Sequence, residues 1–124
     1  MDTRDPYHEA CLGLLQHHRG PLLVPVLVVA EAAYLIQRGI GVSQELDLLR
    51  DLFEGSLAPV PIDPADWARI VELVWRYRDL PLGTVDASVI STAERLNIAQ
   101  IATLDRRHFS VVRPQHVDSF ELLP

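Results

Sequence analysis

Three acidic residues, Glu31, Asp86 and Asp105, stand where a carboxylate could take part in catalysis. Glu31 lies inside the apolar stretch 21–36, and no lysine or arginine follows it before Arg38. An ionised carboxylate among apolar side chains is costly unless a positive charge accompanies it. A divalent cation would supply that charge, because clustered carboxylates bind Mg²⁺ or Mn²⁺ and such ions assist phosphoryl transfer. The three residues are therefore candidate ligands of a metal site.

The two aspartates also have ordinary structural explanations. Asp86 can lie in the first turn of a helix and Asp105 can close a strand, and neither position requires catalysis. Glu31 is harder to explain structurally, since a glutamate inside an apolar helix is seldom buried without a partner. A zinc site is not indicated, because Cys11 and the histidines do not form a zinc-binding pattern. The sequence contains no Walker loop, no GxGxxG fingerprint and no Gly-x-Ser-x-Gly elbow.

The first half of the chain is predicted to form three helices and a short extended run. Their expected ranges are Pro6–Arg19, Pro21–Val24 (extended), Val26–Arg38 and Ser43–Glu54. A glycine follows each helix, which favours a left-handed residue at its end, and Ser43 can cap the third. Apart from Glu31, the second helix is apolar nearly all round. This pattern predicts that the helix is buried and that Glu31 lies deep in the protein.

The second half alternates short strands with helices. The expected elements are an edge strand at Leu57–Ile62, a helix capped by Asp63, a helix at Val85–Leu96 capped by Thr84, and a β-rich run at Ala99–Leu104. Trp67 and Trp75 recur at helical spacing with aliphatic residues, which predicts that they belong to the core. The alternation favours a parallel sheet covered by helices on both faces. Asp86 and Asp105 would then approach the carboxyl ends of its strands, where such sheets bind ligands.

Composition limits the classes of protein to consider. The chain has 124 residues, 48% of them hydrophobic and 23% charged, which fits one globular domain and excludes a disordered chain. The stretch 21–36 is too short and too polar to span a membrane, and the N-terminus has no secretion signal, so a cytoplasmic protein is expected. The net charge of −6 disfavours diffuse binding to nucleic acid. Any RNA must be held locally by arginine, since all 11 basic residues are arginines.

Four segments, in this order and spacing, resemble PIN-domain proteins of the VapC toxin type. They are Asp5-Pro6-Tyr7-His8-Glu9-Ala10-Cys11, Val28-Val29-Ala30-Glu31-Ala32-Ala33-Tyr34-Leu35, Asp79-Leu80-Pro81-Leu82-Gly83-Thr84-Val85-Asp86-Ala87-Ser88 and Ile101-Ala102-Thr103-Leu104-Asp105-Arg106-Arg107-His108-Phe109. The last two are the most specific, and together the four extend over nearly the whole chain. The resemblance implies a PIN-like α/β fold, a three-layer sandwich in which helices cover both faces of a short parallel sheet.

The resemblance also implies an activity and a set of site residues. The expected protein is a Mg²⁺- or Mn²⁺-dependent endoribonuclease whose metal-activated water attacks the phosphodiester. By motif, Glu31, Asp86 and Asp105 would hold the metal and carry catalysis. Asp79 and Thr103 match supporting positions, although Thr103 is equally explained as a strand residue.

Partners follow from the same resemblance. The protein would be the toxin of a bacterial toxin–antitoxin pair, held inactive by a small antitoxin encoded by a neighbouring gene. A homodimer is implied as well. Arg106 and Arg107, beside Asp105, are the candidates for binding RNA phosphates, with a solvated turn as the alternative explanation. A membrane partner is not expected.

The sequence departs from the family at its beginning. Family members open with a hydrophobic strand that lies centrally in the sheet and ends in an aspartate, the first metal ligand. Nothing precedes Met1, and Asp2-Thr3 lies too close to Asp5-Pro6 to end such a strand. We therefore expect residues 1–124 to form a single, N-terminally shortened PIN-like domain that lacks its first central strand. A start codon assigned too late, or a truncated gene, would explain this.

Two other functions remain open on the sequence alone. The missing aspartate favours a catalytically degenerate PIN domain that binds an antitoxin or dimerises without cleaving RNA. Retention of Glu31, Asp86 and Asp105 favours the enzyme. A metal-dependent phosphodiesterase acting on DNA or a nucleotide is the third possibility, because no motif reads the substrate directly.

Overall fold

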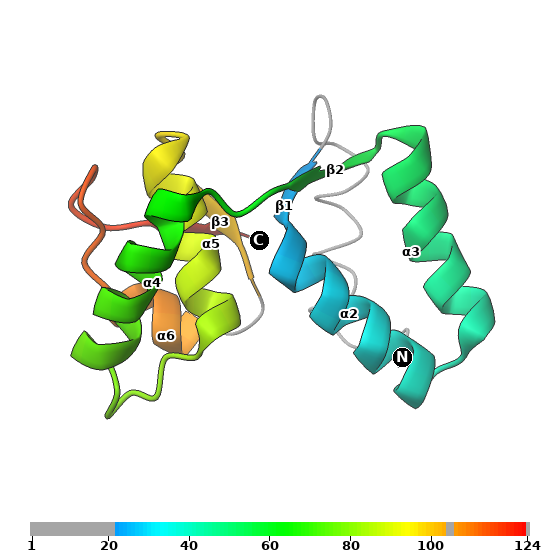
Figure 1. Ribbon diagram of the computed structural model, residues 1–124, viewed down its shortest axis with the longest axis horizontal. Helices are drawn as coiled ribbons and strands as arrows, with labels where there is room; N and C mark the ends of the chain where they lie inside the picture. The colour runs from blue at the N-terminus through cyan, green and yellow to red at the C-terminus, as the bar shows by residue number, and fades with distance from the viewer. Residues whose placement is uncertain (1–21, 104–105, 124) are drawn as a thin grey trace.

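The computed structural model describes residues 22–103 and 106–123, and in this part the chain forms an α/β fold (Figure 1). The elements are β1 (Leu22–Pro25), α2 (Val26–Gly39), α3 (Val42–Glu54), β2 (Leu57–Val60), α4 (Pro64–Arg76), α5 (Thr84–Arg95), β3 (Gln100–Ala102), α6 (Arg106–Val111) and β4 (Glu121–Leu123). The predicted helix at 6–19 and Asp105 lie outside the described residues. The short elements α6 and β4 were not predicted, because three to six residues are too few to show a hydrophobic period.

The strands form two separate parallel pairs. β1 pairs with β2, with Leu22 opposite Leu57 and Pro25 opposite Val60. β3 pairs with β4, with Gln100 opposite Glu121. The prediction of a parallel α/β fold is confirmed, but within residues 22–103 and 106–123 no strand joins β1 to β3.

Each strand pair belongs to a different side of the molecule. β1, β2, α2 and α3 lie on one side in Figure 1, and α4, α5, α6, β3 and β4 lie on the other. The segment after β2 crosses between them, and α5 contacts both β1 and α2. α5, which carries Asp86, therefore lies where the two sides meet.

The helix ends show which sequence signals control the local structure. Asp63 and Asp66 form a reciprocal capping box at the start of α4, and Pro64 occupies the first turn, as predicted. α3 ends at Gly55 in the left-handed conformation, with φ 92°. Two predicted caps were wrong by one or two residues: Gly41 precedes α3 and Gly83 precedes α5, so that Ser43 and Thr84 lie inside their helices. Neither glycine offers a side-chain cap, and the helices are instead positioned by packing.

The described core lies between α4, α5, β3 and α6. Leu73, Ile90 and Val112 have no exposed surface there. The predicted burial of the helix at 26–38 was wrong: α2 contains no buried residue and Glu31 is exposed. Its described neighbours β1, β2, α3 and α5 contact only part of its circumference.

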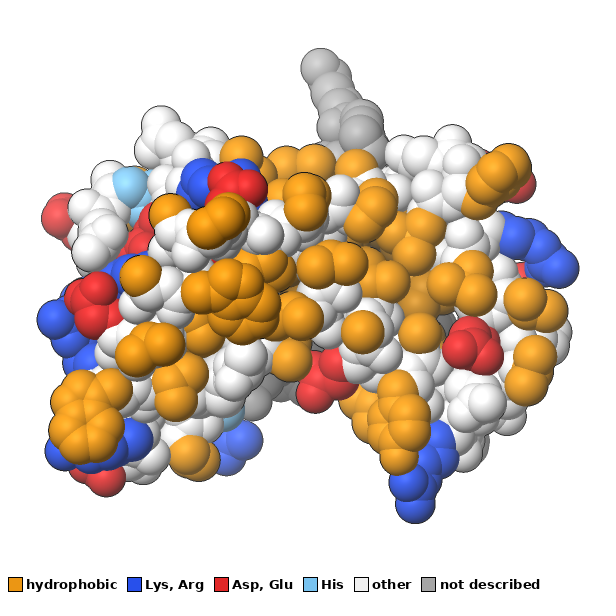
Figure 2. Space-filling model, in the orientation of Figure 1, with side chains coloured by type: hydrophobic (Ala, Val, Ile, Leu, Met, Phe, Trp, Pro, Cys, Tyr) orange, Lys and Arg blue, Asp and Glu red, His pale blue; other side chains and the backbone are white. Residues whose placement is uncertain are grey.

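The aromatic residues of α4 were also predicted wrongly. Ile70 and Leu73 form the buried face of the helix, whereas Trp67, Val71 and Trp75 are 47–69% exposed on another face. α4 has more apolar residues than its buried face can accommodate, so some of them remain exposed to solvent. Figure 2 shows hydrophobic side chains spread over both sides of the molecule on the face drawn.

Candidate active site

Asp86 is held in a fixed orientation by a histidine. It lies in the first turn of α5, and its Oδ2 is 2.9 Å from Nδ1 of His108 on α6. Because a carboxylate only accepts, the ring nitrogen donates this hydrogen bond. The side chain of His108 is 16% exposed and that of Asp86 is 34% exposed. A half-exposed carboxylate with one oxygen fixed by an imidazole is suited to binding a cation from solvent.

The first turn of α5 is itself well anchored. The amide of Ala87 donates to the carbonyl oxygen of Gly83 at 3.0 Å, and Ser88 Oγ donates to that of Val85 at 2.6 Å. Ala87 and Ser88 are completely buried. Burial on one face of this turn leaves Asp86 at its outer margin, where it can meet a ligand.

His108 is the site residue that sequence reasoning missed. It lies within the segment 101–109 that carries the family resemblance, but the sequence alone indicates no role for it. The available signal was its position directly after two arginines and close to Asp105. Recognising the contact required α6, whose six residues show no clear period.

The other predicted site residues that the structure describes lie on several different elements. Thr103 continues the β3–β4 ladder by donating its amide to Leu123 O at 2.8 Å. Arg106 and Arg107 are exposed in the first turn of α6, and Arg106 Nη2 lies 3.4 Å from Leu122 O. Asp79 is exposed in the turn between α4 and α5. Thr103 and both arginines also make polar contacts with other groups.

The described residues do not by themselves form a complete metal site. Among residues 22–103 and 106–123, no three His, Cys, Asp or Glu side chains lie close enough to hold an ion. Asp105 is outside this part of the chain. The donor chemistry of Asp86 fits a hard cation, and the oxygen ligands beyond it are not brought together by the described residues.

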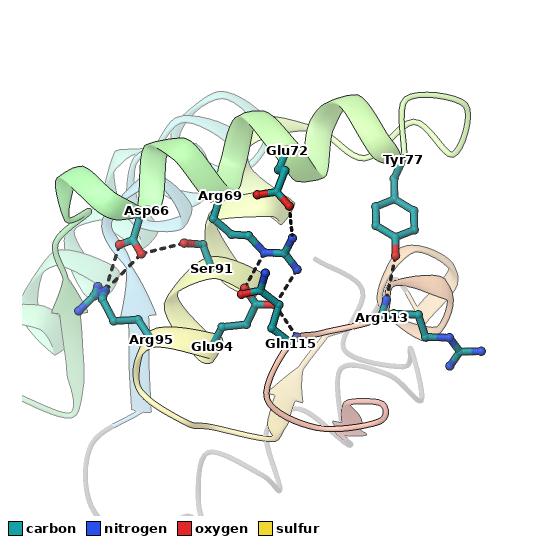
Figure 3. A network of polar contacts seen from close by, with 9 residues as sticks. All are labelled: Asp66, Arg69, Glu72, Tyr77, Ser91, Glu94, Arg95, Arg113 and Gln115. Atoms are coloured by element: carbon teal, nitrogen blue, oxygen red, sulfur yellow. Dashed lines mark hydrogen bonds and ion pairs between the residues drawn. The ribbon is translucent and has the colours of Figure 1, made fainter.

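A bidentate ion pair fastens α5 to α4 (Figure 3). Nε and Nη2 of Arg69 each donate to Glu94 at 2.8 Å, and both side chains are about nine-tenths buried. Glu94 Oε2 also accepts the amide of Gln115 at 2.8 Å. The hydrogen bonds to Glu94 raise the pKa of Arg69, and burial opposes them without reversing the shift. Glu94 thus ties α4, α5 and the segment after α6 together.

A second contact joins the first turn of α4 to α5. Ser91 Oγ donates to Asp66 Oδ1 at 2.7 Å, and Arg95 Nε lies 3.1 Å from Asp66 Oδ2. Burial by itself would raise the pKa of Asp66. The hydrogen bonds from Ser91 and the Asp63 amide, together with the charge of Arg95, outweigh burial and hold the pKa of Asp66 below its ordinary value. These contacts make α5 a rigid carrier for Asp86.

Comparison with known proteins identifies the family. The family model described as PIN domain matches residues 3–113. The chain is 34% identical to ribonuclease VapC26 of Mycobacterium tuberculosis (strain ATCC 25618 / H37Rv) over 124 residues, which is 100% of this chain and 92% of that protein. The chain is a PIN-domain protein of the VapC type. The predicted family is therefore confirmed.

A solved structure supports the fold of this PIN domain. The chain matches the crystal structure of Mycobacterium tuberculosis VapC20, a toxin that cleaves the sarcin–ricin loop, with a TM-score of 0.71. The match has 14% sequence identity and covers 80% of this chain and 76% of the other. At this identity the similarity concerns the fold alone. No helix in the described part of the PIN domain is long and apolar enough to cross a membrane.

Proposed function

We propose that this PIN-domain protein is an endoribonuclease that acts as the toxin of a toxin–antitoxin pair. The observation that carries the proposal is the 34% identity, over the full chain, to a protein named ribonuclease VapC26. The hydrogen-bonded Asp86 at the start of α5 supports it, because an oriented and half-exposed carboxylate is what a hydrolytic metal site requires.

In the proposed site, Glu31, Asp86 and Asp105 hold Mg²⁺ or Mn²⁺. When bound, such an ion supplies an activated water and stabilises the charge of phosphoryl transfer. His108 keeps Oδ2 of Asp86 in place, so that the carboxylate does not have to reorient when the ion arrives. Asp79 and Thr103 have supporting positions.

RNA would be bound next to this site by the first turn of α6. Arg106 and Arg107 are exposed there, directly before His108. Guanidinium groups bind phosphate bidentately. Two arginines can therefore bind the RNA backbone even though the net charge of the protein is −6. We further propose a single domain over residues 1–124, a cytoplasmic location, a homodimer and a small antitoxin partner from a neighbouring gene.

One observation favours a second function. The described residues contain no group of three metal-binding side chains. A degenerate PIN domain that binds the antitoxin or dimerises without cleaving RNA is compatible with that finding. Activity assays distinguish the two functions directly.

The deciding experiment is cleavage of a structured RNA pool with Mn²⁺ or Mg²⁺, compared with EDTA. We expect metal-dependent cleavage that Asp86→Asn abolishes. Asp51→Asn is the matched control, since Asp51 is exposed on α3, on the other side of the molecule. Matching DNA is assayed in parallel.

Each alternative has its own outcome in this assay. Equal cleavage of RNA and DNA would point to a general phosphodiesterase. A folded chain without activity, which still co-purifies with the product of the neighbouring gene, would point to the degenerate binding module.

A further inference from the structure

The end of α4 places an exposed tryptophan against an arginine. Trp75 is 67% exposed, and the guanidinium carbon of Arg78 lies 4.0 Å from the centroid of its ring. Nη1 of Arg78 also donates to the carbonyl oxygen of Trp75 at 2.8 Å. The hydrogen bond and the cation–π contact together hold the guanidinium on one face of the indole. Most of the tryptophan nevertheless remains open to solvent, so a ligand can reach its ring.

The positive charge beside this ring is not neutralised within the described part of the chain. Arg69 and Arg95 each form an ion pair with a carboxylate. Arg78 and Arg113 form none among the described residues, although Asp79 directly follows Arg78 in the sequence. Both arginines are exposed. In a protein of net charge −6, exposed cations without a carboxylate partner are suited to an anionic ligand.

A hydrogen bond connects this end of α4 to α6. The amide of Arg113, two residues after α6 ends, donates to Oη of Tyr77 at 2.9 Å. α6 has six residues and is therefore about 9 Å long, and its first turn carries His108, the partner of Asp86. The end of α4, α6 and the start of α5 lie together at the lower edge of the molecule in Figure 1. A single strand that leaves the candidate active site can therefore reach the tryptophan by following α6.

Single-stranded RNA matches both properties of this surface. Unpaired bases stack on aromatic side chains, and their phosphates bind arginine. Figure 2 shows basic side chains beside hydrophobic ones over the end of α4. Trp67, at the other end of α4, is also exposed, but no described arginine lies over its ring. On α4 the exposed ring and the cation thus coincide only next to α6, which favours RNA over a second copy of the chain as the occupant.

We propose that Trp75 and Arg78 form a second contact for RNA, outside the catalytic centre. One unpaired base stacks on the open face of the indole, while Arg78 holds the ring and binds the adjoining phosphate. Arg113 binds a phosphate between this base and the cleaved bond. Because every base has a π-face, the contact selects an unpaired nucleotide and not a particular sequence. The inference rests on the proposed function, since the ligand is the same RNA, but its test measures binding without cleavage.

The test is binding of a fluorescein-labelled oligouridylate to the purified full chain in EDTA, which prevents metal-dependent cleavage. Trp75→Ala should reduce the affinity about tenfold, and Trp75→Phe should retain most of it, because stacking needs only an aromatic ring. Arg78→Gln should reduce the slope of log K against log salt by about 0.7. Trp67→Ala and Arg76→Gln are the matched controls on the same helix and should leave the affinity and the slope unchanged.

Fluorescence shows whether a base contacts the ring directly. The chain has two tryptophans, so Trp67→Phe leaves Trp75 as the only one. Oligouridylate should quench the emission of this variant over the same concentrations at which it binds. An RNA duplex should quench it little, because paired bases stack on one another and are not available to the indole. Circular dichroism verifies that each variant is folded.

Three results would overturn the proposal. The first is an unchanged RNA affinity in Trp75→Ala. The second is binding of oligouridylate without quenching in the Trp67→Phe variant. The third is a Trp75→Ala substitution that dissociates a dimer and leaves RNA affinity unchanged, which would identify a contact between two copies of the chain.

The RNA contact and the proposed nuclease activity fail in different ways. Cleavage that Asp86→Asn abolishes, combined with binding that Trp75→Ala does not affect, would contradict the RNA contact alone. Binding that depends on Trp75, in a chain that cleaves no RNA, would support the RNA contact and contradict the nuclease activity.

Discussion

The hydrogen bond from His108 to Asp86 connects α6 to the first turn of α5. We expect His108→Ala to lower the rate of RNA cleavage about 10–100-fold, as loss of a group that orients a metal ligand usually does. Affinity for Mn²⁺, measured by calorimetry, should fall in parallel, while KM for RNA changes little. His108→Asn should recover part of the activity, because its amide can donate the same hydrogen bond.

Ser110→Ala is the control for this experiment. Ser110 is exposed on α6, and its hydroxyl donates to the carbonyl oxygen of Arg107 at 3.3 Å. Unchanged Mn²⁺ affinity in His108→Ala would contradict the positioning role of His108, whatever the effect on stability.

The buried hydroxyl of Thr92, which has no hydrogen-bond partner in the described part of the chain, lowers the free energy of unfolding of the free protein. Replacing it by a methyl group in Thr92→Val should raise the free energy of unfolding by about 1–2 kcal/mol, because an unsatisfied buried polar atom is removed. Urea unfolding of the free chain measures the change. Thr92→Ser should show no such gain, and a destabilised Thr92→Val would mean that the hydroxyl is paired after all.

At the scale of elements, the contacts between α4 and α5 give the molecule a pH dependence. The pKa of Asp66 lies below its ordinary value of 3.8, so between the folded-state pKa and 3.8 the unfolded chain binds more protons than the folded one. The stabilisation by Asp66 is therefore complete above 3.8 and is lost as the pH falls through the folded-state pKa. Asp66→Asn should lower stability at pH 7 and should flatten its decline in acid.

Urea unfolding at pH 7, at pH 5 and at several values below about pH 4 tests this prediction. Asp51→Asn, an exposed substitution on α3, should retain the acid dependence of the natural chain. An Asp66→Asn variant with that same acid dependence would show that other carboxyl groups control it.

Some helix ends were predictable because their signals are local, whereas the caps predicted at Ser43 and Thr84 were wrong. The capping box of α4 and the left-handed Gly55 depend on a few neighbouring residues. The exposure of Glu31 and the contact between Asp86 and His108 depend on how distant elements pack. Apolar character around α2 indicated burial, yet its described neighbours leave it without a single buried residue.

For the whole molecule, the net negative charge opposes RNA binding, whereas the local positive charge of arginines favours it. A chain of net charge −6 repels RNA at long range, so binding should depend on the few arginines that contact phosphate. Arg107→Gln should weaken binding of single-stranded RNA and reduce the slope of log K against log salt by about 0.7. Arg76→Gln, exposed at the end of α4, should leave the slope unchanged.

The family was predictable from sequence because four short segments keep their order along the chain. The divided sheet was only partly predictable: the expected loss of a central strand came from the resemblance, whereas the groove lined by β1 and β3 is a property of packing. Sequence patterns predict which face of a helix or strand is apolar and where the element ends. They do not predict the space that remains between elements after packing.

The buried residues are distributed unevenly between the two sides of the molecule, which affects how the protein unfolds locally. Between residues 22 and 60 only Pro25 and Val60 are buried, while the described core gathers around α4 and α5. Regions with few buried contacts undergo local unfolding at lower free energy than the rest. Native-state hydrogen exchange should therefore resolve two cooperative units, with amides of α2 and α3 exchanging through partial opening. Those of α5 should exchange only when the entire chain unfolds.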